Sequence, residues 1–105
     1  MVTLNDIARD AQRLRQEKGW APKSPEERFV YLVGEVGELA QAISRLRLGS
    51  GVDGDSERIE ARADVGAEMY DVIWNVCDLA NILSIDLDAA AATKAEFNRR
   101  RISRP

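Results

Sequence analysis

Two pairs of carboxylates repeat one spacing in this sequence. Glu35 and Glu38 are three residues apart, and Glu68 and Asp71 have the same interval. Residues three apart lie on one face of a helix, so each pair presents both side chains together. If two such pairs faced each other, like charges about 4 Å apart would repel by about 4 kcal/mol per contact at an effective dielectric constant of about 20. A divalent cation removes this cost, and the spacing therefore predicts a metal site, with solvated acidic helix faces as the alternative.

The residue types that are missing narrow the chemistry further. The chain has no histidine and a single cysteine, Cys77. This excludes Ser-His-Asp and Cys-His catalysis, histidine-ligated zinc or haem, and a disulfide within the chain. Any bound metal must have oxygen ligands, which favours Mg²⁺, Mn²⁺ or Ca²⁺. A general base must be a carboxylate, a lysine, a tyrosine or a metal-bound water.

The elements that would hold these acids are helices. Apolar residues recur at helical spacing nearly throughout, which predicts an all-α fold. Ser24 followed by Pro25 and two glutamates is a strong helix start. We expect helices at about 4–19, 25–48, 57–83 and 87–101, with a connection at 20–23 and a flexible glycine-rich loop at 49–56. One acidic pair then falls on the second helix and the other on the third.

The third predicted helix is apolar on most sides between residues 72 and 83. Such a helix must be buried on most sides, and a chain of 105 residues has little material to surround it. Because no shift in composition divides the chain, we expect a single domain over residues 1–105. The sequence thus predicts a four-helix bundle-like chain that oligomerises through its third helix.

The overall composition points to an ordinary globular protein. Lys and Arg total 15 against 18 Asp and Glu, a net charge of -3, which gives no support to non-specific nucleic-acid binding. No apolar run approaches the roughly 20 residues of a membrane span, and the N-terminus has no signal-peptide pattern. We therefore expect a cytoplasmic protein with neither nucleic acid nor membrane as its partner.

The motifs also resemble a known family. The segment 32–39, Leu-Val-Gly-Glu-Val-Gly-Glu-Leu, resembles the first metal motif of the MazG-like all-α nucleotide pyrophosphohydrolases, and Glu68-Met69-Tyr70-Asp71 resembles the second. The residue sequence of the first motif is most similar to that of the dCTP pyrophosphatase branch. The last predicted helix is also similar to the family's closing helix, so the resemblance covers residues from about 20 to 101.

The resemblance implies a specific reaction. Family members hydrolyse nucleoside triphosphates, often deoxynucleotides, to the monophosphate and pyrophosphate with Mg²⁺, and Mn²⁺ is a possible substitute. The metal ligands implied for this chain are Glu35, Glu38, Glu68 and Asp71. Glu35 or Glu38 is then the candidate catalytic base that accepts a proton from the attacking water. A role in nucleotide-pool house-cleaning and a homodimer or homotetramer are also implied.

Substrate contacts are expected from two further places. Lys94, Asn98 and Arg101 share one helical face, where the cations would meet phosphates and the amide a sugar or base edge. Trp20 would stack on a base. The alternatives are a solvated basic helix end and a tryptophan that closes the end of the bundle.

Some positions depart from the family pattern. Gly34 stands where many members have glutamate, and Asn75 stands where the dCTP-hydrolysing branch tends to have an aromatic residue, which argues against cytosine selectivity. Asp78 has no family counterpart that we can place. Because glycine weakens a helix by up to about 1 kcal/mol relative to alanine, Gly34 and Gly37 suggest the close approach of a ligand or of another helix.

Two other functions compete with this one. One is a phosphoribosyl-ATP pyrophosphohydrolase-like enzyme, which would bind its metal through the same carboxylates but would have a different pocket for the nucleobase. The other is a non-catalytic helical dimerisation module. The four motif acids argue against the module, because partner binding alone does not require all of them beside apolar stripes.

Overall fold

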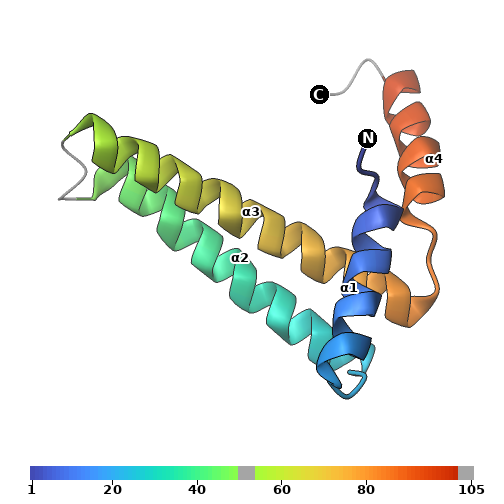
Figure 1. The fold of residues 1–105 in the computed structure, drawn as a ribbon. Helices are drawn as coiled ribbons and strands as arrows, with labels where there is room; N and C mark the ends of the chain where they lie inside the picture. Colours follow the sequence, from blue (N-terminus) through green and yellow to red (C-terminus); the bar gives the residue numbers. More distant parts are fainter. Residues whose placement is uncertain (50–53, 102–105) are drawn as a thin grey trace.

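The computed structural model describes residues 1–49 and 54–101. It contains the helices α1 (Leu4–Lys18), α2 (Pro25–Leu48), α3 (Asp55–Leu83) and α4 (Leu87–Arg100), shown in Figure 1. The expected all-α class and four helices are confirmed, while half of the predicted flexible loop, residues 50–53, lies outside the described residues. The described ranges contain no strand, and none of their helices is long and apolar enough to cross a membrane.

Local sequence signals fix several of the helix ends. Thr3 and Ser24 each form a capping box, the first with Asp6 and the second with Glu27. Gly19 ends α1 with a φ of 67°, a left-handed conformation that glycine adopts without steric cost. This turn sends the chain through Trp20 to the start of α2, and it places that segment beside the end of α3.

The helices are arranged around a long hairpin. α2 and α3 run antiparallel and pack along their length, α1 packs across the end of the hairpin where α3 finishes, and α4 packs mainly on α1 (Figure 1). The Asn81 side-chain amide on α3 donates a 2.7 Å hydrogen bond to the main-chain oxygen of Ala8 on α1. At the start of α1, the Leu4 main-chain N–H donates to the Asp88 carboxylate of α4 at 3.1 Å.

The core of the single chain is small. Its largest fully buried side chains are Asp78 and Cys77, and the radius of gyration is 16.8 Å, against about 13 Å for a compact domain of this length. The buried apolar residues are Ala8, Ala11, Ala61, Val65, Cys77 and Ala80. The chain is therefore more open than a four-helix bundle. On α3, Ile73 and Val76 remain 40% and 37% exposed, so the chain does not bury this helix on most sides by itself.

Candidate metal centre and adjoining pocket

Carboxylates from both helices of the α2–α3 hairpin meet near its middle. Glu35 on α2 and the pair Glu68 and Asp71 on α3 each offer an oxygen atom, and these oxygens all lie within 4.8 Å of one another. The three-residue spacing on α3 aims both of its acids at α2, as expected for one helix face. The hairpin thus brings together three of the four acids predicted from the sequence.

The fourth acid, Glu38, lies beside this group. Its charge raises the pKa values of both Glu35 and Glu68. It also lines a hollow of about 480 Å³ on the far side of the cluster, together with Glu68, Gln41, Arg45 and Asp64. All four acids therefore interact across α2 and α3.

The electrostatics of the cluster show an uncompensated negative charge. Burial and the negative charges of Glu38, Asp71 and Glu68 raise the pKa of Glu35 from 4.5 to about 7. Burial and the negative charges of Glu38 and Asp71 raise the pKa of Glu68. No lysine or arginine contributes to either shift.

Two oxygens of the cluster are left without partners. Oε2 of Glu35 and Oε2 of Glu68 are buried and have no hydrogen-bond donor among the described residues. Because buried polar atoms in native proteins are nearly always hydrogen-bonded, such orphaned oxygens need an explanation. A hard divalent cation with oxygen ligands fits this donor set, which consists entirely of carboxylates.

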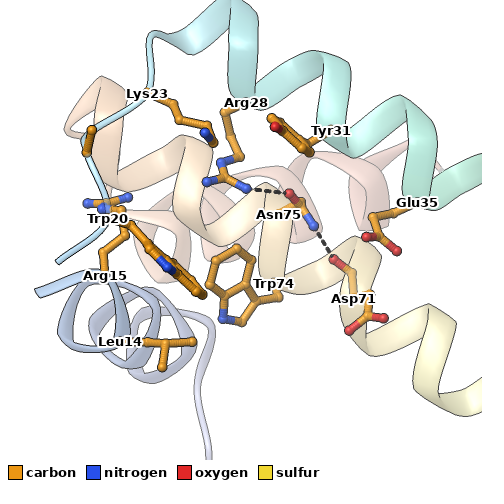
Figure 2. A pocket seen from close by; sticks show the side chains of 11 residues that line it. Leu14, Arg15, Trp20, Lys23, Arg28, Tyr31, Glu35, Asp71, Trp74 and Asn75 are labelled. Carbon is orange, nitrogen blue, oxygen red and sulfur yellow. Dashed lines mark hydrogen bonds between the residues drawn. The ribbon is translucent and has the colours of Figure 1, made fainter. Parts of the chain in front are cut away.

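A pocket of about 590 Å³ adjoins the cluster. Glu35 and Asp71 lie on one side of it, and α1, α2, α3 and the segment between α1 and α2 enclose it (Figure 2). Its other lining residues are mainly aromatic and basic: Leu14, Arg15, Trp20, Ala21, Lys23, Arg28, Tyr31, Trp74 and Asn75. Pockets of this size and apolar character commonly hold small organic ligands. Trp20, one of the predicted substrate residues, is thus part of the pocket wall.

A buried polar network forms the base of the pocket. Arg28 Nη1 donates a 2.9 Å hydrogen bond to Asn75 Oδ1, and Asn75 Nδ2 donates to the main-chain oxygen of Asp71 at 2.8 Å (Figure 2). The Arg28 guanidinium also lies over the rings of Trp74 and Tyr31, 5.3 and 5.5 Å from their centroids. The network therefore connects the aromatic wall to the helix segment that carries a cluster acid.

Sequence reasoning missed most of this pocket, although the spacing held a signal. Arg28 and Tyr31 precede Glu35 by seven and four residues, which places them on its helix face. Trp74 and Asn75 follow Asp71 by three and four residues in the same way. Extending each acidic face by two turns towards the Trp20 end of the hairpin would have found all four residues.

The closing helix lies apart from the cluster within one chain. Lys94, Asn98 and Arg101 do not line the pocket beside Glu35, and α4 packs mainly on α1. The side chains of Lys94 and Arg101 instead lie over the Phe97 ring, 4.7 and 5.5 Å from its centroid. One chain therefore does not bring these predicted phosphate contacts to the acids.

The helix glycines beside Glu35 have open space around them in the single chain. A Cβ atom built at Gly34 or Gly37 would have no neighbouring atom within 4 Å in the described chain. Both glycines lie on the exposed side of α2. No helix of the described chain approaches these glycines, and the predicted close approach of a ligand or of another helix stays a prediction.

Comparison with known proteins identifies the family. The sequence model of the MazG nucleotide pyrophosphohydrolase domain matches residues 23–103, which include all four acids and the closing helix. The chain belongs to the MazG family. Its activity class is accordingly that of a nucleotide pyrophosphohydrolase, as the resemblance of its motifs predicted.

Two relatives of this MazG protein are similar over most of its length. Human dCTP pyrophosphatase 1 is 37% identical over 101 residues, covering 94% of this chain and 58% of the human protein. The uncharacterized protein YvdC of Bacillus subtilis (strain 168) is 30% identical over 89 residues, covering 83% of this chain and 84% of YvdC. The MazG chain thus spans little more than half of its human relative. The family match begins at Lys23, so Arg15 and Trp20 lie outside it.

Proposed function

We propose that this MazG protein hydrolyses nucleoside or deoxynucleoside triphosphates to the monophosphate and pyrophosphate with Mg²⁺. The observation that supports this most directly is the carboxylate cluster with two orphaned buried oxygens beside an aromatic pocket. In this proposal Glu35, Glu38, Glu68 and Asp71 hold the metal, for which Mn²⁺ is a substitute. The bound metal would neutralise triphosphate charge and activate water for attack on phosphorus.

The chain's own residues then take complementary roles. Glu35 or Glu38 accepts the proton of the attacking water. Trp20, Trp74 and Tyr31 enclose the base, since aromatic rings stack on any nucleobase. Asn75 occupies the part of the pocket wall where the dCTP-hydrolysing branch tends to have an aromatic residue, so we do not expect cytosine selectivity. Nucleotide-pool house-cleaning in the cytoplasm is the cellular role that this reaction would serve.

The protein is further proposed to act as a homo-oligomer, either a dimer or a tetramer. Exposed apolar side chains form one stripe on α2, with Phe29, Val33, Val36 and Ile43, and another on α3, with Met69, Ile73 and Val76. Monomeric proteins rarely leave such extended apolar stripes in water. Gly34 and Gly37 lie on the exposed side of α2, where a neighbouring subunit could approach closely. Assembly would also allow Lys94, Asn98 and Arg101 of one subunit to reach the phosphates bound in another.

A substrate panel tests the reaction. The protein is incubated with Mg²⁺ and each of the common nucleoside and deoxynucleoside triphosphates, and the products are separated by ion exchange. We expect a monophosphate and pyrophosphate in equal amounts, with loss of activity in EDTA and recovery with Mg²⁺ or Mn²⁺. Phosphoribosyl-ATP belongs in the panel, because its exclusive hydrolysis would favour the competing enzyme. No turnover of any member, or release of orthophosphate alone, would contradict the proposal.

A charged substitution tests the assembly. Ile73→Glu places a carboxylate on the exposed stripe of α3, and we expect it to dissociate the oligomer or unfold it. Val2→Glu is the control, since Val2 is also exposed but lies outside the helices. Light scattering at micromolar concentration reports the mass. An active, monodisperse monomer of the wild-type protein would contradict the proposed oligomer.

A further inference from the structure

Asp78 joins three helices at the bottom of the pocket. It is fully buried on α3, where its Oδ2 lies 3.0 Å from Nε of Arg28 on α2. Its Oδ1 forms an ion pair and hydrogen bond with Arg15 on α1. One carboxylate thus contacts two guanidinium groups that are themselves largely buried.

Such a network is not the simplest way to stabilise this junction. Buried ion triads can often be replaced by apolar side chains of similar volume without loss of stability, because removing charges from water is costly. The immediate neighbours of Asp78 on α3 include buried Cys77 and Ala80, so an apolar residue would suit the site. The presence of three charged groups therefore suggests a task other than stability.

The contacts of the two arginines indicate what that task is. Arg28 lies over the Trp74 and Tyr31 rings and donates to Asn75, which donates to the Asp71 main chain. Arg15 lies on α1 four residues before the turn at Gly19, and its main-chain oxygen accepts a 3.0 Å hydrogen bond from the Trp20 N–H. Asp78 therefore links the wall that carries Trp20 to the wall that carries Trp74 and Tyr31.

We propose that Asp78 is a positioning residue. It holds the pocket wall that carries Trp20 at a fixed distance from the wall that carries Trp74 and Tyr31, so that a nucleobase fits between them. It acts through Arg15 and Arg28 and touches neither substrate nor metal. This inference rests on the proposed function, since it takes the pocket beside the acids to be the base site. Its loss should weaken recognition of the base and leave the carboxylate cluster able to bind a cation.

Intrinsic fluorescence gives a direct measure of the pocket. The chain has two tryptophans, and both Trp20 and Trp74 line this pocket. Titration with each of the common nucleoside monophosphates, without metal, reports base binding as a change in tryptophan emission. Mn²⁺ binding is measured separately by calorimetry. Neither readout requires turnover.

Two variants separate positioning from folding. Asp78→Asn removes the shared charge and leaves two buried guanidinium groups unbalanced. The double variant Arg15→Met/Asp78→Asn removes one charge of each sign, so it remains informative if the single variant does not fold. Asp10→Asn is the matched control, because Asp10 pairs with Arg13 on the exposed side of α1.

We expect both test variants to bind nucleoside monophosphates at least about tenfold more weakly, as losses of supporting contacts typically do, with unchanged Mn²⁺ affinity. Unchanged nucleotide affinity in the folded variants would overturn the proposal, as would an equal loss of nucleotide and Mn²⁺ binding. If the wild-type protein hydrolyses triphosphates but monophosphates do not alter its emission, the proposed function stands and this inference fails. If emission responds in an Asp78-dependent way but nothing is hydrolysed, the inference stands and the proposed function fails.

Discussion

The two buried carboxylate sites of this protein are balanced in opposite ways. Asp78 is fully buried, and two arginines from different helices lie against it. Glu35 and Glu68 keep one buried oxygen each without a donor, and their closest charged neighbours are other acids. Both groups of carboxylates lie on the α2–α3 hairpin, while Arg15, one of the two arginines at Asp78, comes from α1.

This contrast separates a carboxylate whose charge two arginines balance from acids that lie among other acids. Where the chain supplies its own cations, the carboxylate orders the side chains around it, here Arg15, Arg28 and through Arg28 the residue Asn75. Where it supplies none, the cost of close negative charges remains until a cation arrives from solution. The hydrogen bond from Asn75 to the Asp71 main chain physically connects the two sites.

The contrast predicts opposite effects on stability. Asp78→Asn leaves two guanidinium groups buried without their counter-ion and should lower the free energy of unfolding by about 3–5 kcal/mol. Glu35→Gln removes a repelled charge and should not lower it in metal-free protein. Chemical denaturation of both variants in EDTA checks this. Equal destabilisation by the two substitutions would erase the distinction between the sites.

Activity should respond to the acidic cluster more than to any exposed acid. Glu38→Gln and Asp71→Asn should each reduce turnover by at least about 100-fold, because losing a ligand should cost no less than losing a supporting contact. The fold should survive, since each change also relieves repulsion. Glu60→Gln, an exposed acid on the same α3 helix, is the control. Full activity in either cluster variant would refute the metal-site assignment.

Regular spacing made much of this molecule predictable. The helix ends followed from caps such as Ser24 and Gly19, and the shared helix face of each acidic pair followed from one repeated three-residue interval. These features depend on neighbours close in sequence, so composition and periodicity contain them.

The pocket was harder to predict because its contacts join distant segments. Asp78 stood in the sequence as an acid on an apolar helix, and only the crossing of α1 over α3 brings Arg15 to it. Trp74 lies in the apolar run 72–83, whose pattern predicts only buried packing. Likewise, periodicity could not show that Lys94 and Arg101 lie over Phe97 on a helix that packs mainly on α1.

The acidic cluster should also make the stability of the protein depend on pH. We expect this effect to be smaller than the effects of the substitutions above. Because the pKa of Glu35 is raised from 4.5 to about 7, the metal-free folded protein holds a proton that the unfolded chain releases in this range. The stabilising contribution of protonated Glu35 is therefore fully present below pH 4.5 and is lost as the pH rises through about 7. Thermal unfolding in EDTA should show this fall, and Mg²⁺ should reduce it by replacing the proton.

Glu35→Gln is the control for that titration, because it removes the group without adding a charge. The variant should show a flatter dependence of melting temperature on pH between 4.5 and 7. A dependence as steep as that of the wild-type protein would mean that other groups, and not the acidic cluster, control it.

The smallest effects are expected on α4, where basic side chains are neither buried nor paired with the cluster. If the acidic cluster binds a metal with a triphosphate, Lys94 and Arg101 of a neighbouring subunit should contact its phosphates, and alanine at either position should raise KM. Asn98→Ala should alter discrimination between bases or sugars. Stability should change by less than about 1 kcal/mol, because exposed charges contribute little.

Arg99→Ala is the matched control, since Arg99 is also exposed on α4 but pairs with Glu96. Steady-state kinetics at saturating Mg²⁺ separates these cases. Unchanged kinetics in all three test variants would show that the basic face is only solvated. The phosphates would then depend on the metal and the pocket cations alone, with Lys23 at the pocket rim as the next residue to substitute.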